Sequence, residues 1–176
     1  MTFSDEIIFR GDNLKKNEME KTNVMRLLEQ KKVPYDAHCY VETGAVNGVE
    51  VATILGQNPE CVFKTLVTVG KSKNYYVFVI PVNQELDLKK AAKSVGEKAI
   101  QMIKSKELLD VAGYIHGGCS PIGMKKYFRT TFHQTATQFD KIFFSAGKIG
   151  YQVEVNPADI STIIRVEFAD LIVEDY

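Results

Sequence analysis

The chain has 176 residues, a length typical of one domain; 45% are hydrophobic and 25% charged, as in a globular protein rather than a disordered one. Lys plus Arg balance Asp plus Glu at 22 each, and a net charge of zero argues against a protein that coats nucleic acid. The apolar runs are too short to cross a bilayer and the start lacks the features of a secretory signal, so we expect a cytoplasmic protein outside the membrane.

The charges are unevenly distributed along the chain. Segment 64–148 holds 14 basic and 6 acidic residues, a surplus of +8, so the flanks carry a surplus of −8. This asymmetry is consistent with a basic face that attracts phosphates. It is equally consistent with lysines scattered over several surfaces, because neighbours in sequence need not share a face.

The first predicted elements are an extension, two helices and a strand. Residues 1–18 are polar and lack periodicity, which predicts a loose extension ahead of one domain at 19–176. Apolar spacing predicts a helix over 22–33, ending before a proline. Alternation predicts a strand over 33–39. Capping-box spacing and an apolar stripe then predict a short helix over 47–55.

A hairpin and two helices are predicted next. The β-rich runs 61–69 and 75–82 are separated by GKSKN, a short glycine-containing segment that suits a hairpin. We expect both runs to be central strands. Helical spacing returns at 88–95 and in SKELLDVAG, residues 105–113, where the final glycine is a typical helix end.

The last third of the chain is predicted to be mainly β. The glycine-rich loop GGCSPIG occupies 117–123, and strands are expected near 141–145 and 151–155. A helix should open at Pro157, a residue suited to a first helical turn, before a last strand over 166–173. The order predicts a single compact α/β (α+β mixed) domain: a mixed, largely antiparallel sheet or partly open barrel with surrounding helices.

Motifs of several common enzyme classes are absent. The chain has no GxxxxGK[ST], no GxGxxG and no HExxH. Ser120 does not fit a nucleophile elbow, because the next residue, Pro121, has no N–H for an oxyanion hole. His116 and Cys119 lack a second pair with metal-ligand spacing, and three cysteines without CxxC spacing predict reduced thiols. We therefore expect neither a metal nor a cofactor.

Lys64 and two loops are the candidate functional features. Lys64 lies in CVFKTLVTV, where an unpaired ammonium is costly to bury. It could line a pocket and face a carbonyl, phosphate or developing oxyanion, or be an edge-strand lysine whose head reaches water. Loop 116–123 allows close backbone approach to a ligand, and loop 145–150 offers a hydroxyl, a cation and two glycines, yet each could be an ordinary structural turn.

Three segments taken together point to a family. VFKTL at 62–66, GYIHGGCSPIGMKK at 113–126 and FFSAGKIG at 143–150 resemble the YbaK family of bacterial aminoacyl-tRNA deacylases, and the resemblance runs from about Thr22 to Val173. The sequence looks like the branch that clears cysteinyl-tRNA(Pro). The resemblance implies the mixed fold of the editing domain of bacterial prolyl-tRNA synthetases.

The resemblance also implies roles for particular residues. Lys64 matches the family's essential lysine, Ser145 its pocket serine, and Gly118 the loop backbone that approaches the scissile ester, so these are the expected catalytic residues. Ile149 stands where relatives often carry a second basic residue, which bears on a contact to the tRNA end. Cys119 is expected to be chemically a spectator. The expected substrate-binding residues are Tyr40, Thr65, Gly117, Cys119, Ser120, Pro121, Gly147 and Lys148.

The expected reaction needs little chemical machinery. The resemblance implies that the substrate's own thiol attacks its ester carbonyl and expels the tRNA as a cyclic thioester forms, while the protein positions the ester and stabilises charge. The expected partners are the acceptor end of aminoacyl-tRNA and, transiently, prolyl-tRNA synthetase. The alternatives are a deacylase that removes alanine or another small residue with a protein-held water, and a non-catalytic module that binds tRNA or a synthetase.

Overall fold

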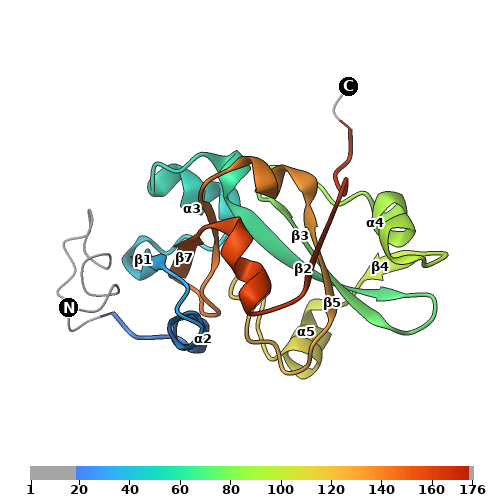
Figure 1. The fold of residues 1–176 in the computed structure, drawn as a ribbon, viewed down its shortest axis with the longest axis horizontal. Coiled ribbons are helices and arrows are strands. Elements are labelled where there is room, and N and C mark those ends of the chain that lie inside the picture. The colour runs from blue at the N-terminus through green and yellow to red at the C-terminus, as the bar shows by residue number, and fades with distance from the viewer. Residues whose placement is uncertain (1–18, 175–176) are drawn as a thin grey trace.

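A computed structural model describes residues 19–174, which form two β-sheets with helices packed around them (Figure 1). The extension expected at 1–18 lies outside the described residues. The α-helices are α2 (Asn23–Gln30), α3 (Gly48–Ile54), α4 (Leu88–Val95) and α5 (Ser105–Ala112). The strands are β1 (Tyr35–Cys39), β2 (Phe63–Gly70), β3 (Tyr75–Pro81), β4 (Ile100–Met102), β5 (Arg129–His133), β6 (Ile142–Ser145), β7 (Tyr151–Val155) and β8 (Val166–Ala169).

The larger sheet has the strand order β4-β2-β3-β5-β8. β2 pairs antiparallel with β3 and β4, whereas β5 pairs in parallel with β3 and β8. The predicted hairpin between β2 and β3 is present: the Gly70 N–H donates to the Asn74 carbonyl over 2.8 Å, and Lys73 adopts a positive φ of 75° in the turn. The sheet is therefore mixed, as expected, and β2 and β3 are central strands.

Two strands of this sheet, β4 and β5, are missing from the sequence-based prediction. β5 reads Arg-Thr-Thr-Phe-His and shows no apolar alternation, yet its last four residues are buried. It lies between β3 and β8, and a parallel strand covered on both faces need not alternate. The Thr130 hydroxyl donates to the Phe128 carbonyl over 2.8 Å, which satisfies one polar group that burial would otherwise leave unpaired.

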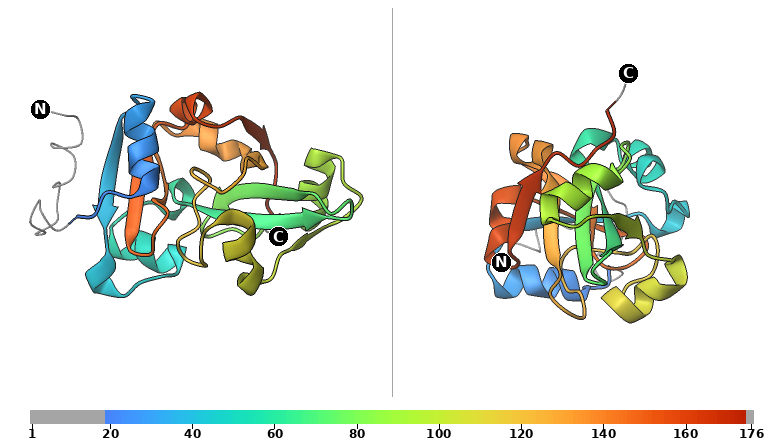
Figure 2. Two further views of the ribbon diagram at one scale, coloured as in Figure 1. Left: turned by 90° about the horizontal axis from the view of Figure 1, so that it is seen from below. Right: turned by 90° about the vertical axis from the view of Figure 1, so that its right-hand side faces the viewer.

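The smaller sheet is antiparallel, with the order β1-β7-β6. It occupies the end of the molecule that carries α2, while the β2–β3 hairpin extends toward the opposite end (Figure 2). A single parallel bridge between Val62 and Phe143 joins the start of β2 to β6. Segments that are far apart in sequence therefore meet beside the first half of β2.

Helix ends follow the capping rules, with one correction to the prediction. The Thr22 hydroxyl accepts the Met25 N–H at the start of α2, and the Asn47 side chain accepts the Val49 N–H at the start of α3. The helix expected from Pro157 is a short 3-10 helix, Pro157–Thr162, a type of helix that seldom extends over many residues.

Within residues 19–174, no helix has the length and apolarity needed to cross a bilayer.

Candidate active site

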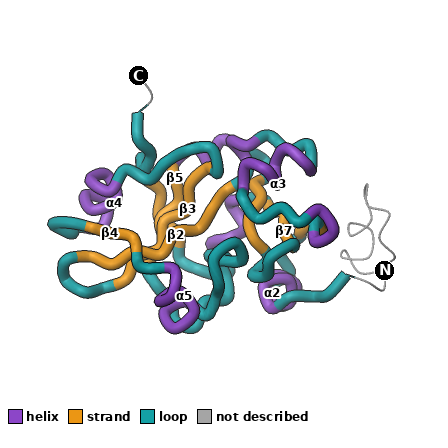
Figure 3. Tube along the Cα trace, turned by 180° about the vertical axis from the view of Figure 1, so that it is seen from behind, coloured by secondary structure: helices purple, strands orange, loops and turns teal. Residues whose placement is uncertain are grey.

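A cavity of about 330 Å³ lies beside the first half of β2, a volume within the range of small-molecule sites. Figure 3 shows β2 running between α3 and α5, and residues of both helices line the cavity, together with residues of β6, β7 and the loop that follows α5. Four consecutive residues of β2, from Phe63 to Leu66, also line it. Because neighbouring strand residues point to opposite faces, a cavity that touches all four must lie against the edge of the strand.

Lys64 is partly buried beside this cavity. Burial lowers the pKa of its ammonium, and the negative charge of Glu85 opposes that shift. Among residues 19–174, no Asp or Glu lines the cavity. Because β2 is a central strand, Lys64 is not the edge-strand lysine that the sequence left open. It is a cation in a cavity wall, and the potential that it creates there favours negative charge.

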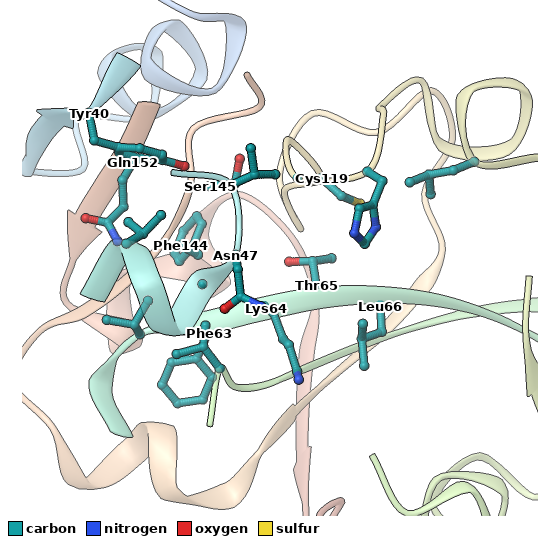
Figure 4. A pocket seen from close by; sticks show the side chains of 18 residues that line it. Tyr40, Asn47, Phe63, Lys64, Thr65, Leu66, Cys119, Phe144, Ser145 and Gln152 are labelled. Carbon is teal, nitrogen blue, oxygen red and sulfur yellow. The ribbon is translucent and has the colours of Figure 1, made fainter. Parts of the chain in front are cut away.

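Thr65 leaves β2 on the side opposite to Lys64 (Figure 4). Its hydroxyl points into the space bounded by Asn47, Ser145 and Cys119. The Thr65 Oγ1 atom is buried and has no hydrogen-bond partner within residues 19–174. A buried hydroxyl without a partner costs free energy, so this atom is a candidate for contact with a ligand.

Neutral polar groups gather around Ser145, which ends β6. Its Oγ accepts the Gly147 N–H over 3.1 Å, which leaves the hydroxyl hydrogen available for donation. Tyr40 is 6% exposed, and burial raises the pKa of its phenol, so the phenol is protonated at neutral pH. Gln152 is 3% exposed and exchanges two hydrogen bonds, of 2.7 and 3.0 Å, with the Gln57 amide. The side chains of Tyr40, Ser145 and Gln152 therefore give this end of the cavity uncharged polar groups.

The two glycine-containing loops pack against each other. Gly117 has a φ of +88° and lines the cavity; a Cβ there would lie 2.6 Å from the Val46 side chain. A Cβ on Gly118 would lie 3.1 Å from the backbone nitrogen of Ile149. Gly118 thus faces the second loop rather than the cavity, and its lack of a side chain allows the two loops to approach closely.

Cys119 lines the cavity but is a poor candidate nucleophile. Burial raises the pKa of its thiol to about 12, so the reactive thiolate is scarce at neutral pH.

Ser120 is fully buried, and its hydroxyl accepts the Ile122 N–H over 3.4 Å. Pro121 lines a separate cavity of about 220 Å³. In the described part of the chain, no three His, Cys, Asp or Glu side chains gather as a possible metal site.

Lys148 lies outside the cavity lining. Its ammonium is exposed, forms an ion pair with Glu20 and lies 5.4 Å from the centre of the Tyr151 ring. The hydrogen bond to Glu20 raises the pKa of Lys148.

The structure brings about half of the predicted site residues to the cavity. Those that line it are Tyr40, Lys64, Thr65, Gly117, Cys119 and Ser145, and those that do not are Gly118, Ser120, Pro121, Gly147 and Lys148.

Several cavity residues were not predicted as substrate-binding residues from the sequence. Gln152 stands in an ordinary alternating strand, and Leu66 and Leu108 resemble core residues. Asn47 is recognisable only as a helix cap, and His116 only as a possible metal ligand. Their place in the cavity depends on which segments the fold brings together.

Comparisons with known proteins agree on a family. The aminoacyl-tRNA editing domain family matches residues 44–163. A relative from Enterococcus faecalis, named "Putative Cys-tRNA(Pro)/Cys-tRNA(Cys) deacylase EbsC", is 46% identical over 158 residues, which cover 89% of this chain and 96% of the relative.

Solved structures share the fold. A "putative trans-editing enzyme for prolyl tRNA synthetase" superposes with a TM-score of 0.74 at 21% identity, covering 86% of this chain and 95% of that one. A hypothetical protein superposes with a TM-score of 0.79 at 18% identity, covering 88% of this chain and 100% of that one. At such identities the likeness establishes the fold alone. The family match and the E. faecalis relative establish more: the chain belongs to the aminoacyl-tRNA editing domain (YbaK) family.

Proposed function

We propose that this chain is a trans-acting deacylase that removes cysteine wrongly attached to tRNA(Pro). The observation that carries the proposal is a cavity lined by a partly buried lysine and by no carboxylate, in a chain 46% identical to a relative named for deacylation of Cys-tRNA(Pro) and Cys-tRNA(Cys). A cationic cavity of this kind suits a reaction in which negative charge develops on the substrate.

The substrate supplies its own nucleophile in the proposed reaction. The cysteine sulfur attacks the carbonyl carbon of its own ester, so that a C–S bond forms and the bond to the ribose oxygen breaks. The thiol proton passes to the ribose oxygen, and the cyclic thioester is later hydrolysed by water. This route does not depend on the Cys119 thiol, whose raised pKa makes it a weak nucleophile.

The protein contributes position and charge. Lys64 holds the ribose end of the substrate and offsets the charge that develops there, and the Ser145 and Tyr40 hydroxyls bind uncharged polar atoms of the aminoacyl group. Fixed donors are effective because they need no reorganisation as the reaction proceeds. Holding the thiol and ester in a reactive geometry lowers the barrier further.

Selectivity against proline follows from the missing thiol. Rejecting one small apolar side chain by size is worth only about 1–3 kcal/mol. The requirement for a thiol adds discrimination that pocket shape cannot supply, because prolyl-tRNA has no group that can attack its ester.

A panel of aminoacylated tRNA(Pro) species tests the proposal. Purified chain should release cysteine at least roughly tenfold faster than serine or alanine, and should leave prolyl-tRNA(Pro) intact. Serine turnover equal to that of cysteine would indicate a protein-held water instead. Binding without release of any amino acid would indicate a non-catalytic module.

We also propose prolyl-tRNA synthetase as a transient partner, acting in the cytoplasm. The cavity has room for little more than the aminoacylated end of a tRNA, and contacts to phosphates carry little sequence information. Adding the synthetase should raise kcat/KM for Cys-tRNA(Pro) and leave that for Cys-tRNA(Cys) unchanged. Equal stimulation of both substrates would contradict the partnership.

A further inference from the structure

The two edges of β2 differ in their pairing. Residues with even numbers direct their backbone groups toward β3: the Val82 N–H donates to the Val62 carbonyl and the Gly70 N–H to the Asn74 carbonyl, each over 2.8 Å. The register between these two points is continuous. The backbone groups of the odd-numbered residues therefore face the other edge of the strand, because the direction alternates along an antiparallel pair.

In the part of the chain that the structure describes, that other edge is paired only near the two ends of β2. At the start of β2, the bridge between Val62 and Phe143 connects it to β6. Toward its end, β4 covers Thr68 to Gly70, and the Ile103 N–H donates to the Val67 carbonyl over 3.4 Å. Thr65 lies between these contacts and lines the cavity, and among the described residues no strand pairs with it on this edge.

This gap in the pairing of β2 is centred on Thr65. Thr65 presents one N–H donor and one C=O acceptor on this edge, and its own buried, unpartnered Oγ1 lies nearby. Buried backbone groups are nearly always paired. An aminoacyl group attached to tRNA carries one amine donor and one carbonyl acceptor on the same residue, which is the complementary set.

We propose that the aminoacyl group fills this gap as a one-residue strand, so that the backbone of Thr65 is its binding site. The α-amine donates to the Thr65 carbonyl, and the ester carbonyl accepts the Thr65 N–H. The inference rests on the proposed function. It explains how a site that has no Asp or Glu in its lining can bind the α-amine of an aminoacyl group. The same N–H then faces the oxygen on which negative charge develops during attack.

The pairing also determines which way the substrate side chain points. Residues directly opposite each other in an antiparallel pair share a face. The substrate side chain would lie on the Thr65 side of β2, toward Ser145 and Cys119, and Lys64 would remain on the opposite side for the nucleotide end (Figure 4).

A substrate analogue tests the amine contact on the unmodified protein. 3-Mercaptopropionyl-tRNA(Pro) keeps the thiol and the ester but lacks the α-amine. Its kcat/KM, divided by its uncatalysed rate, should fall roughly tenfold or more relative to Cys-tRNA(Pro), as expected for one lost hydrogen bond to a substrate amine. Equal normalised values would overturn the inference while leaving the deacylase proposal intact, whereas failure to release cysteine at all would overturn the proposed function itself.

A backbone substitution tests the carbonyl contact. Replacing Thr65 by its α-hydroxy acid converts the amide into an ester and removes the N–H, while the side chain and the pairing with β3 are kept. We expect kcat to fall roughly 100-fold, the order seen when one oxyanion donor is removed. Thr65→Ser and Thr65→Val keep the N–H and measure the contribution of the side chain separately, so the loss of kcat in the backbone ester should exceed the loss in either of them. A backbone ester with normal kcat and a native circular dichroism spectrum would overturn the inference.

Discussion

The strand around Lys64 and the loop around Lys148 place the same side chain in opposite surroundings. Lys64 is partly buried, lines the cavity and has a pKa lowered by burial. Lys148 is exposed, pairs with Glu20 and has a pKa raised by that hydrogen bond. Among the described residues Lys64 has no ion-pair partner, so its cation is available to a substrate, whereas that of Lys148 is paired with Glu20. The comparison therefore favours Lys64 over Lys148 as the candidate for the chemistry.

The largest expected effect is on activity at Lys64. Lys64→Ala should lower kcat/KM for Cys-tRNA(Pro) by roughly 100-fold, because it removes the positive charge that faces the developing negative one. Single-turnover deacylation measures the loss. If this variant loses only affinity and keeps its rate at saturating substrate, the chain is a binding module rather than an enzyme.

Gly118 packs against the loop that carries Lys148, and Gly118→Ala should reduce stability by about 1–3 kcal/mol, as overpacking does. The new Cβ would lie 3.1 Å from the Ile149 nitrogen and 3.4 Å from the Lys148 carbonyl carbon, so the loops must separate and activity should fall as well. Urea unfolding and deacylation together measure this.

Gly96→Ala provides the control for that substitution. Its φ is +74° and its Cβ would meet no atom within 4 Å, so it should lose stability through backbone strain and keep full activity. Equal losses of activity in the two variants would show that the contact between the loops is unimportant for the site.

Stability at Lys64 should change in the direction opposite to activity. Lys64→Met removes a partly buried charge and should stabilise the fold at pH 7, by a few tenths of a kcal/mol because solvent screens the ammonium. The folded pKa is lowered, so the folded state releases this proton first and wild-type stability rises with pH up to the unfolded pKa. The difference in free energy of unfolding between Lys64→Met and the wild type should therefore become smaller from pH 8 to pH 10.5, as measured by urea titration. A difference that does not change with pH would contradict this prediction.

The smallest effect is expected at Lys148. Lys148→Met breaks an exposed ion pair with Glu20, and such pairs contribute little. Activity should change by less than about twofold, and the small loss of stability should disappear at high salt because exposed charges are screened. A large loss of kcat/KM would show that Lys148 contacts the tRNA and that its role is larger than the comparison with Lys64 indicates.

The local elements were predictable to different degrees. Asn47 marks the start of α3 correctly, and the β2–β3 hairpin follows from its turn, because capping and turn chemistry are local. β5 escapes prediction because its partners are β3 and β8, which lie far away in sequence. The 3-10 helix at 157–162 differs from a predicted α-helix only in its hydrogen-bond pattern, which composition does not specify.

The candidate site was predictable where a motif carries it. Lys64, Thr65 and Ser145 stand in recognisable segments, and all three line the cavity. Lys148 and Gly118 stand in the same segments, yet they do not line it, since one is drawn to Glu20 and the other packs on Ile149. A motif fixes which residues are near in sequence, whereas packing decides which of them face the ligand.

The sequence by itself determined the order of most elements, the family and the lysine to examine, because these depend on local periodicity and short motifs. Only the tertiary structure revealed the gap in strand pairing at Thr65 and the raised pKa of Cys119. It also showed that the basic middle and the acidic flanks partly neutralise each other, with Lys90 beside Asp170 and Arg129 beside Glu167. Strand pairing, burial and charge interaction all depend on distances in space between residues remote in sequence, and those distances exist only once the chain has folded.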